Sequence, residues 1–293
     1  MTRLISTLSQ QEQINFLLTN RIPRRFATQF MGWFSQLKNP LVTKASLKVW
    51  RLFARDLDLS EAKKSQFTSL HDCFIRELKE DARCIDQQED IITSPCDAIV
   101  GSCGTVKNGT VFQAKGFPYD ISDLIFDKRL QDKYQNGVYV TLRLTSTMYH
   151  RFHAPMDCQV NKVTYISGDT WNVNPIALKR IEKLFCKNER AVIELLGNDE
   201  EKNITLVPVA AILVASIKLH CLPDNLDMNY QGPSEIHCQA QYKKGEQMGY
   251  FQHGSTIIAF ASHHHVLCEH IKSGQRIKMG QALFKDFDAN NLN

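Results

Sequence analysis

Two different spacings of apolar residues divide the chain near residue 90. Before that point the apolar positions recur at helical intervals, as in the segments ASLKVWRLFARDLDLS and SLHDCFIRELKE. After it, short β-branched runs such as GVYVTLRL, AVIEL and STIIAF are separated by Gly, Asn and Asp. The pattern predicts an α+β chain, with an N-terminal helical region over residues 1–70 and a mostly antiparallel β domain over residues 71–293.

The clearest helical pattern follows Pro23, a residue that suits the first turn of a helix. One predicted face carries the large apolar residues Phe26, Phe30, Trp33, Phe34 and Leu37. Its start is flanked by Arg21, Arg24 and Arg25. Rings with cations beside them are typical of a helix that lies on an anionic membrane. A helix packed on the protein core has the same pattern, so the pattern alone leaves both interpretations open.

Positive charge is concentrated in the same region. Residues 1–55 contain nine Lys or Arg and one acidic residue, a net charge of +8, whereas the whole chain carries +4. Such a segment is expected to bind an anionic surface, either membrane or nucleic acid, and the aromatic face favours the membrane. The longest apolar run, Ile204–Ile217, is shorter than the roughly 20 residues that cross a bilayer and contains Pro208. It is predicted to be a buried strand.

The nine cysteines are scattered and contain no C-x-x-C pair. This spacing suggests neither a zinc ribbon nor a disulfide framework, and it indicates a reducing compartment. The first residues lack the basic-then-apolar order of a secretory signal. We therefore expect a protein that is not exported.

Three segments of the β domain carry candidate chemistry. The first, TSPCDAIVG, places Asp97 after Pro95, where an Asp by itself is most often a turn residue. The second, YHRFHAPMD, contains His150 and His153, a spacing that two metal ligands can have. No third ligand is evident in the sequence, so no metal site is predicted. The third segment is HGST, residues 253–256.

An activated serine hydroxyl needs a serine, a histidine and an acidic residue, and this chain offers Ser255, His153 and Asp97. A neutral imidazole can take the serine proton, while the carboxylate fixes the imidazole tautomer and stabilises its cation. A hydrolase built on these residues is one interpretation. Its usual esterase form is disfavoured, because the G-x-S-x-G turn would require glycines where His253 and Ile257 stand.

Six segments occur in the order and approximate spacing of one family: SPCDAIVG, YHRFHAP, NERAVIEL, VPVAAILVASI, KGEQMGYFQHGSTIIAF and IKMGQALF. From about residue 65 to 285 the chain resembles the bacterial-type, pyruvoyl-dependent phosphatidylserine decarboxylase family. The upstream segment LHDCFIRELKEDARCID is similar to the lead-in segment of that family. The resemblance implies a carboxy-lyase of phospholipid biosynthesis that converts phosphatidylserine to phosphatidylethanolamine and CO₂.

The resemblance also implies a zymogen that cleaves itself between Gly254 and Ser255. Ser255 Oγ attacks the Gly254 carbonyl, with His153 as the base and Asp97 orienting it, and an elimination then leaves a pyruvoyl cofactor derived from Ser255. Glycine fits the first position because it lets the nucleophile and the backbone approach closely. The products are a β chain, residues 1–254, and an α chain, residues 255–293. Strands such as STIIAF are expected to keep the α chain in the sheet.

In turnover, the resemblance implies that the substrate amine forms a Schiff base with the pyruvoyl ketone, which accepts electrons as the carboxylate leaves. His150 is our candidate for delivering a proton to Cα or for handling the substrate carboxylate, and a structural histidine is the alternative. Many family members have an apolar residue where this chain has His253, to which we assign no role. The run His263–His265 is expected to be solvated or packed rather than bound to metal.

The resemblance implies that the protein acts on phosphatidylserine within a membrane. It also implies a homodimer and no binding of nucleic acid. We expect peripheral attachment to the cytoplasmic side of the cell membrane, with lipid contacts from Arg24, Arg25, Phe30 and Trp33. Two alternatives stay open, the Ser-His-Asp hydrolase and an inactive homologue that serves as a lipid-binding scaffold. Retention of Asp97, His153 and Ser255 argues against the inactive homologue.

Overall fold

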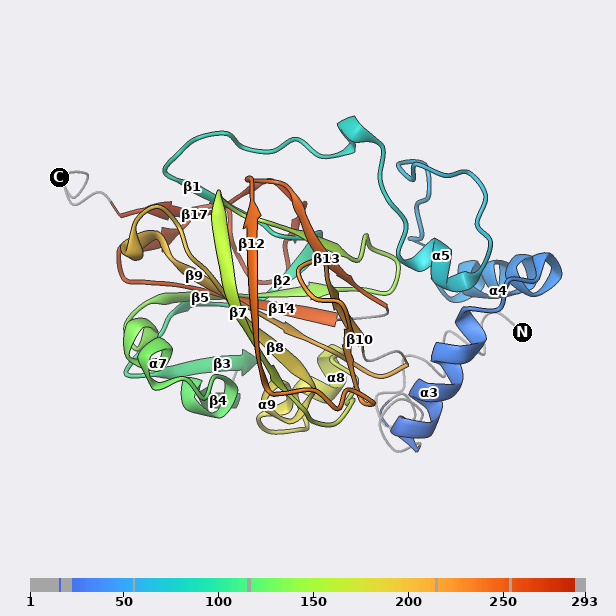
Figure 1. Cartoon of the computed structure of the whole chain (residues 1–293), viewed down its shortest axis with the longest axis horizontal. Helices are drawn as coiled ribbons and strands as arrows, with labels where there is room; N and C mark the ends of the chain where they lie inside the picture. Colours follow the sequence, from blue (N-terminus) through green and yellow to red (C-terminus); the bar gives the residue numbers. More distant parts are fainter. Residues whose placement is uncertain are drawn as a thin grey trace.

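The computed structural model describes residue 16 and residues 23–54, 56–114, 117–213, 216–252 and 255–287. Arg21, His253 and Gly254 lie outside the described residues. Within the described residues, three α-helices come before the first strand: α3 (Arg24–Ser35), α4 (Pro40–Phe53) and α5 (Leu70–Phe74). Figure 1 shows these helices in blue and cyan along one side of a body made mostly of strands.

The N-terminal helices overlap the predicted segments only in part. Helix α4 ends at Phe53, within ASLKVWRLFARDLDLS, and α5 covers only Leu70–Phe74 of SLHDCFIRELKE. The carbonyl of Pro23 accepts the N–H of Ala27 at 2.9 Å, which starts α3. Asn39 caps α4, because its side chain accepts the N–H groups of Leu41 and Val42. The later helices are short: α6 (Ile121–Leu124), α7 (Lys128–Tyr134), α8 (Pro175–Leu178) and α9 (Leu184–Lys187), with 3-10 turns at Glu80–Ala82 and Glu200–Lys202. None of the helices in the described ranges is long and apolar enough to span a membrane.

The rest of the chain forms antiparallel sheets. The largest has eight strands, in spatial order β12 (Glu235–Tyr242), β7 (Cys158–Ile166), β8 (Arg190–Leu195), β9 (Ile204–Val209), β14 (Ser255–Ala261), β5 (Val138–Leu144), β2 (Ala98–Thr105) and β16 (Arg276–Ile277). Every neighbouring pair in it is antiparallel. The α+β class with mostly antiparallel sheets is therefore confirmed.

Three smaller sheets complete the fold. A four-stranded sheet has the order β11 (Asn225–Asp227), β10 (Ser216–Leu219), β13 (Gln247–Phe251) and β6 (Arg151–His153). A three-stranded sheet has the order β1 (Ile91–Thr93), β17 (Ala282–Asp286) and β15 (His265–Leu267). The last is the hairpin of β3 (Thr110–Ala114) and β4 (Phe117–Asp120).

The eight-stranded sheet is covered on both faces. One face packs with the four-stranded sheet around a core that includes Phe152, Phe251 and Ile257. The other face packs against α6 to α9 around residues such as Ile258 and Phe260. Successive residues of a strand point to opposite faces, so β14 supplies side chains to both cores and is buried along its whole length.

The segment from Ser255 onward is built into the sheets. β14 pairs with β5 on one side and with β9 on the other. Farther along, β17 lies between β1 and β15. The expectation that this segment stays in the sheet after a cut before Ser255 is consistent with these pairings, since both strands are held by backbone hydrogen bonds on two sides.

The apolar run Ile204–Ile217 is not one strand. β9 ends at Val209 and β10 begins at Ser216. Between them Leu213 has φ of +81°, a left-handed backbone that leucine adopts in turns rather than in strands. The prediction of a buried strand is correct for β9, and it is wrong for the residues that follow because the chain turns there into a different sheet.

Candidate active site

Ser255 is the first residue of β14, at the point where β5 and β9 end. Its partner on β5 is Leu144, and the next residue, Thr256, lies opposite Val209 of β9. The side chain of Ser255 is fully buried, and its Oγ has no hydrogen-bond partner among the described residues. Buried hydroxyls are usually hydrogen-bonded, and those of Thr141, Thr170, Ser216 and Thr256 also have no partner among the described residues. What distinguishes Ser255 is its position at the start of β14, on the wall of a cavity.

A cavity of about 440 Å³ lies at these strand ends. Ser255, Arg143 and Thr145 form one part of its wall, and residues 172–175 and 211–213 form the rest. The lining therefore mixes apolar side chains with hydroxyls, amides and one guanidinium. A cavity of this size and composition suits a small polar ligand with an apolar extension.

Asp97 lies just before β2 and is held by a buried arginine. Arg83 Nε donates to Asp97 Oδ1 at 2.8 Å, and a second guanidinium nitrogen pairs with Oδ2. The backbone N–H of Met279 donates to the same Oδ1 at 2.9 Å. Arg83 also pairs with Glu61. The carboxylate of Asp97 thus joins distant segments and does more than close a local turn, which corrects the simplest interpretation of its sequence position.

His153, at the end of β6, is buried and carries a defined tautomer. Its Nδ1 lies 2.8 Å from the carbonyl oxygen of Gly245, which can only accept, so Nδ1 holds the proton. Its Nε2 then accepts the hydroxyl of Tyr149 at 2.9 Å. Burial lowers the pKa of His153 to about 4, opposed in part by the Gly245 hydrogen bond and the Asp97 carboxylate. The imidazole is therefore neutral near pH 7, as a general base must be.

The structure brings Asp97 and His153 into one neighbourhood but leaves Ser255 in another. The N–H of His153 donates to Pro95 O at 2.8 Å, and Arg83 and His153 line one cavity of about 260 Å³. Ser255 lines the other cavity. Across the described ranges, no hydrogen bond joins the side chains of Asp97, His153 and Ser255. No hydrogen-bonded Ser-His-Asp triad is therefore present among these side chains, and His153 would have to reach Ser255 for either a hydrolase reaction or a self-cleavage.

His150 is fully buried and lies next to α5. Its Nδ1–H donates to Met148 O at 2.8 Å, and its ring centroid lies 4.0 Å from that of Phe74. The backbone carbonyl of His150 accepts the N–H of Phe251 at 2.9 Å. His150 is therefore anchored beside the end of β13, the strand that precedes Ser255 in the chain.

The helix α3 is docked on the β domain through Arg24 and Thr28. Arg24 forms an ion pair with Asp169, and its guanidinium carbon lies 3.6 Å from the centre of the Trp171 ring. The N–H of Leu213 donates to Thr28 Oγ1 at 3.1 Å. The charge of Arg24 is thus paired within the chain, and its contact with lipid stays a prediction.

The outer faces of α3 and α4 expose large apolar side chains. On α3, Phe26 is 70% exposed, Phe30 48% and Trp33 61%. Leu41, Val49 and Leu52 of α4 are also exposed. Arg25 is exposed at the start of the same surface. A helix that packs its aromatic face on the core would bury these rings, so the structure argues against that interpretation of the pattern.

The histidine run His263–His265 spans a turn and the start of β15. His263 and His264 lie exposed in a turn, whereas His265 is buried on β15 near Ser262 and Asp286. Over the part of the chain that is described, no three His, Cys, Asp or Glu side chains converge on one point.

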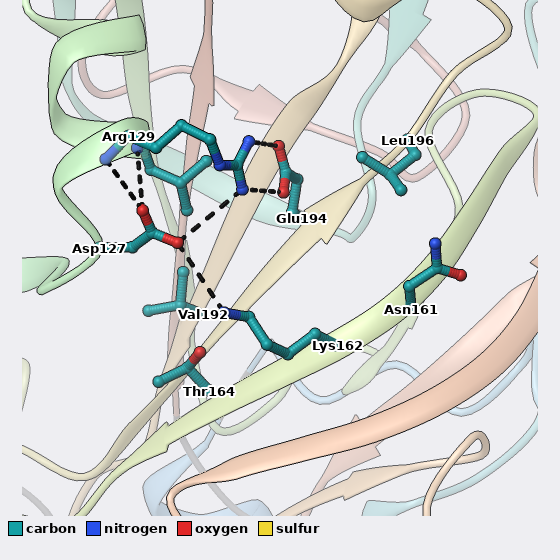
Figure 2. A pocket seen from close by; sticks show the side chains of 9 residues that line it. Asp127, Arg129, Asn161, Lys162, Thr164, Val192, Glu194 and Leu196 are labelled. Carbon is teal, nitrogen blue, oxygen red and sulfur yellow. Dashed lines mark hydrogen bonds and ion pairs between the residues drawn. The ribbon is translucent and has the colours of Figure 1, made fainter.

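A separate small cavity lies against β7 and β8. Figure 2 shows its charged side chains pairing with one another: Arg129 with Glu194, and Lys162 with Asp127. Arg129 donates two hydrogen bonds to the Glu194 carboxylate, at 2.8 and 2.6 Å. The volume, about 50 Å³, is room for little more than a water molecule. This cavity is a surface ion-pair network and contains none of the predicted site residues.

Sequence reasoning missed three residues of the site. Tyr149 stands directly before His150 in the segment YHRFHAP, so its proximity to His153 was available from the motif. Arg83 and Arg143 gave no such signal. Their importance comes from contacts with Asp97 and with the Ser255 cavity, which only the fold reveals.

Comparison with known proteins shows the family of the chain. A model of the phosphatidylserine decarboxylase family matches residues 70–285. Over 277 residues the chain is 32% identical to the phosphatidylserine decarboxylase proenzyme of Haemophilus influenzae, covering 89% of this chain and 92% of the relative. Proteins of the same name from Vibrio parahaemolyticus and Brevibacillus brevis are 33% identical over 247 residues and 29% identical over 270 residues. They cover 81% and 91% of this chain, and 86% and 95% of their own lengths. The chain belongs to the phosphatidylserine decarboxylase family.

Proposed function

We propose that this protein is made as a precursor, cleaves itself between Gly254 and Ser255, and then decarboxylates phosphatidylserine to phosphatidylethanolamine. The observation that carries the proposal is the position of Ser255 at the start of a central strand, with a buried Oγ that has no partner among the described residues. Membership of a family whose relatives are named proenzymes supports the same conclusion.

In the cleavage step, Ser255 Oγ attacks the carbonyl carbon of Gly254, and the peptide C–N bond breaks as the new C–O ester bond forms. Loss of the Cα proton of residue 255 then releases the Gly254 carboxylate and leaves dehydroalanine. Addition of water and loss of ammonia convert that residue to pyruvoyl. Residue 255 is a suitable place for a pyruvoyl group, because Ser255 Oγ has no hydrogen bond to lose among the described residues and its side chain borders a cavity.

The ketone of a pyruvoyl group supplies the electron sink that decarboxylation requires and that no ordinary side chain provides. The residues of this chain bind and orient the substrate and move protons. His153 is proposed as the base of the cleavage, since its Nδ1 proton is fixed by Gly245 O and its Nε2 is the accepting nitrogen. Asp97 is proposed to stabilise the imidazolium, because its negative charge favours the protonated form of His153.

The separation of His153 from Ser255 means that cleavage requires a rearrangement. Tyr149 occupies the lone pair of His153 Nε2, so that hydrogen bond has to open before the imidazole can take a proton from Ser255. His150 is proposed for turnover rather than for cleavage. It is anchored by Met148 O and lies beside the segment that leads to Ser255.

Membrane attachment is proposed through the exposed apolar surface of α3 and α4. A two-chain phospholipid hardly leaves the bilayer, so the enzyme has to reach the interface. Phe26, Phe30 and Trp33 supply exposed apolar area, and Arg25 supplies a cation that favours an anionic leaflet. We propose peripheral attachment on the cytoplasmic side, and a homodimer by analogy with the family.

The direct test is release of CO₂ from phosphatidylserine labelled in the serine carboxyl carbon. We expect purified protein to release labelled CO₂ and Ser255→Ala to release none. Ser262→Ala is a matched control, since Ser262 is also a buried serine of this segment but lies at the far end of β14. A wild-type protein that is cleaved and folded yet releases no CO₂ would contradict the proposed activity.

A further inference from the structure

Arg143 stands out among the residues that line the Ser255 cavity. It is the single charged side chain among the described residues of the wall, and the others are neutral. The described part of the chain gives its guanidinium no hydrogen bond and no ion pair. Burial lowers the pKa of Arg143, and no nearby acid opposes that effect. A half-buried cation without a counterion is unfavourable, and an anionic ligand would relieve the imbalance.

The strand register places Arg143 next to the reacting position. Arg143 of β5 lies opposite Thr256 of β14, and Leu144 lies opposite Ser255. The side chains of Arg143 and Ser255 leave opposite faces of the sheet, yet both border the cavity because β5 ends and β14 begins at this point. A ligand in the cavity can therefore touch both residues.

On the basis of the proposed function, we propose that Arg143 binds the phosphodiester of phosphatidylserine and thereby positions the substrate amine at residue 255. Only the serine carbons and one ester oxygen separate the amine nitrogen from the phosphorus, which matches the adjacency of Arg143 to Ser255. A guanidinium can donate two parallel hydrogen bonds to phosphate oxygens.

The substrate carries two anionic groups, a carboxylate and a phosphodiester. The chemistry of decarboxylation favours the phosphodiester as the group that Arg143 binds. The carboxylate loses its charge when CO₂ departs, so an arginine paired with it would stabilise the starting state more than the transition state. The phosphodiester keeps its charge throughout the reaction. Binding that group holds the substrate without opposing the bond that has to break.

The apolar side of the cavity leads toward the membrane-facing helices. Ile212 and Leu213 line the cavity, and the N–H of Leu213 is bound by Thr28 of α3. The exposed rings of Phe26 and Trp33 lie on the same helix. A lipid whose phosphate is held by Arg143 would thus have its glycerol end near the helix that we propose contacts the bilayer.

The test uses processed protein and short-chain phosphatidylserine below its micelle concentration. We expect Arg143→Gln to raise KM by about 10- to 100-fold with kcat within a few-fold of wild type, the loss typical of a charge-assisted hydrogen-bond pair. Arg143→Lys should raise KM less, because it keeps the charge and loses the paired geometry. Arg129→Gln is the matched control and should leave both constants unchanged, since Arg129 pairs with Glu194 and lines a different cavity that shares no residue with this one.

Two inhibitors distinguish binding of the phosphodiester from binding of the carboxylate. Glycerophosphoethanolamine carries an amine and a phosphodiester, whereas serine carries an amine and a carboxylate. Inhibition by glycerophosphoethanolamine should weaken in Arg143→Gln by the same factor as KM, and inhibition by serine should not change. Unchanged KM in Arg143→Gln, or selective loss of serine inhibition, would overturn the proposal.

A measurement on the wild type keeps the proposal testable if Arg143→Gln does not fold. Phenylglyoxal modifies arginine side chains, and peptide mapping by mass spectrometry reports each one. Glycerophosphoethanolamine should protect Arg143 and serine should not, while Arg129 should react equally in both. Equal modification of Arg143 with and without the phosphodiester would overturn the proposal. Cleavage and CO₂ release by the wild type report separately on the proposed function.

Discussion

The hydroxyl of Tyr149 donates a hydrogen bond to Nε2 of His153, with 2.9 Å between the two atoms. Because the carbonyl of Gly245 holds the Nδ1 proton, Nε2 is the nitrogen that has to take the proton of Ser255 in the proposed cleavage. Tyr149 therefore occupies the lone pair on which that reaction depends. The proposed base therefore has the required tautomer, but its Nε2 is bonded to Tyr149 and not to Ser255.

Tyr149→Phe should release that lone pair. A neutral hydrogen bond contributes about 1 kcal/mol net, so we expect cleavage to be as fast as wild type or up to about fivefold faster. The measurement is the time course of chain separation on denaturing gels after cell-free synthesis. Tyr134→Phe is the control, because Tyr134 is a buried tyrosine bonded to Thr205 away from the site. Cleavage more than tenfold slower in a folded Tyr149→Phe protein would show that Tyr149 relays the proton instead.

We expect His153 and His150 to act in different steps, His153 in cleavage and His150 in turnover. We expect His153→Ala to stay uncleaved and Asp97→Asn to cleave slowly, because the imidazolium loses its stabilising charge; a related triad variant elsewhere loses about 10⁴-fold. His150→Ala should still be cleaved but turn over at least tenfold more slowly, since the proton-transfer contribution of one group is about 10²-fold or more. Gels and CO₂ release measure the two steps independently. Wild-type cleavage in His153→Ala would exclude this histidine as the base.

Acid should destabilise the folded protein through His153. Its pKa is about 4 when folded and about 6.5 when unfolded, so between these values the unfolded chain binds more protons. The stabilisation is present above pH 6.5 and is lost as the pH falls toward 4, and it amounts to about 3 kcal/mol. Denaturant titrations should show a smaller loss for His153→Gln than for wild type over this range. His237→Gln, at an exposed position of β12, is the control. Identical pH slopes for all three proteins would contradict the low pKa.

Local patterns explain what could be predicted from the sequence. The helical spacing after Pro23 and the β-branched run at Ser255 each correspond to an observed element, because spacing reports directly on local backbone conformation. The family resemblance predicts that Asp97, His153 and Ser255 act together. In the structure Asp97 lies near His153, whereas Ser255 lines another cavity. The turn at Leu213 was missed, since an apolar run does not show where a chain passes from one sheet to another.

Contacts between distant segments explain what could not be predicted. Arg24 and Asp169 are 145 residues apart, and nothing in either segment identifies the other as its partner. Arg143 lies in a strand whose sequence is an ordinary apolar run, and the role that we propose for it depends on the cavity formed by residues 172–175 and 211–213. Such assignments require the assembled fold.

Vesicle binding should depend on the rings of α3 more than on its charges. Phe30→Ser combined with Trp33→Ser should lower the bound fraction of protein by more than tenfold at any salt concentration, because apolar insertion is not screened. Arg25→Gln should lower binding about fivefold at low salt only, since one cation contributes about 1 kcal/mol near an anionic leaflet. Phe126→Ser, an exposed ring on the β domain, is the control. Co-sedimentation with vesicles containing anionic lipid is the assay, and equal binding by all variants would show that another surface meets the membrane.

The mass of the denatured protein tests the central claim most directly, because it reports the cut and the conversion of Ser255 together. We expect two chains, residues 1–254 and residues 255–293, with the shorter one lighter by one ammonia than a chain that begins with serine. Ser255→Ala should give a single uncut chain. An intact wild-type chain that still releases CO₂ from phosphatidylserine, or a short chain that retains an N-terminal serine, would contradict the account.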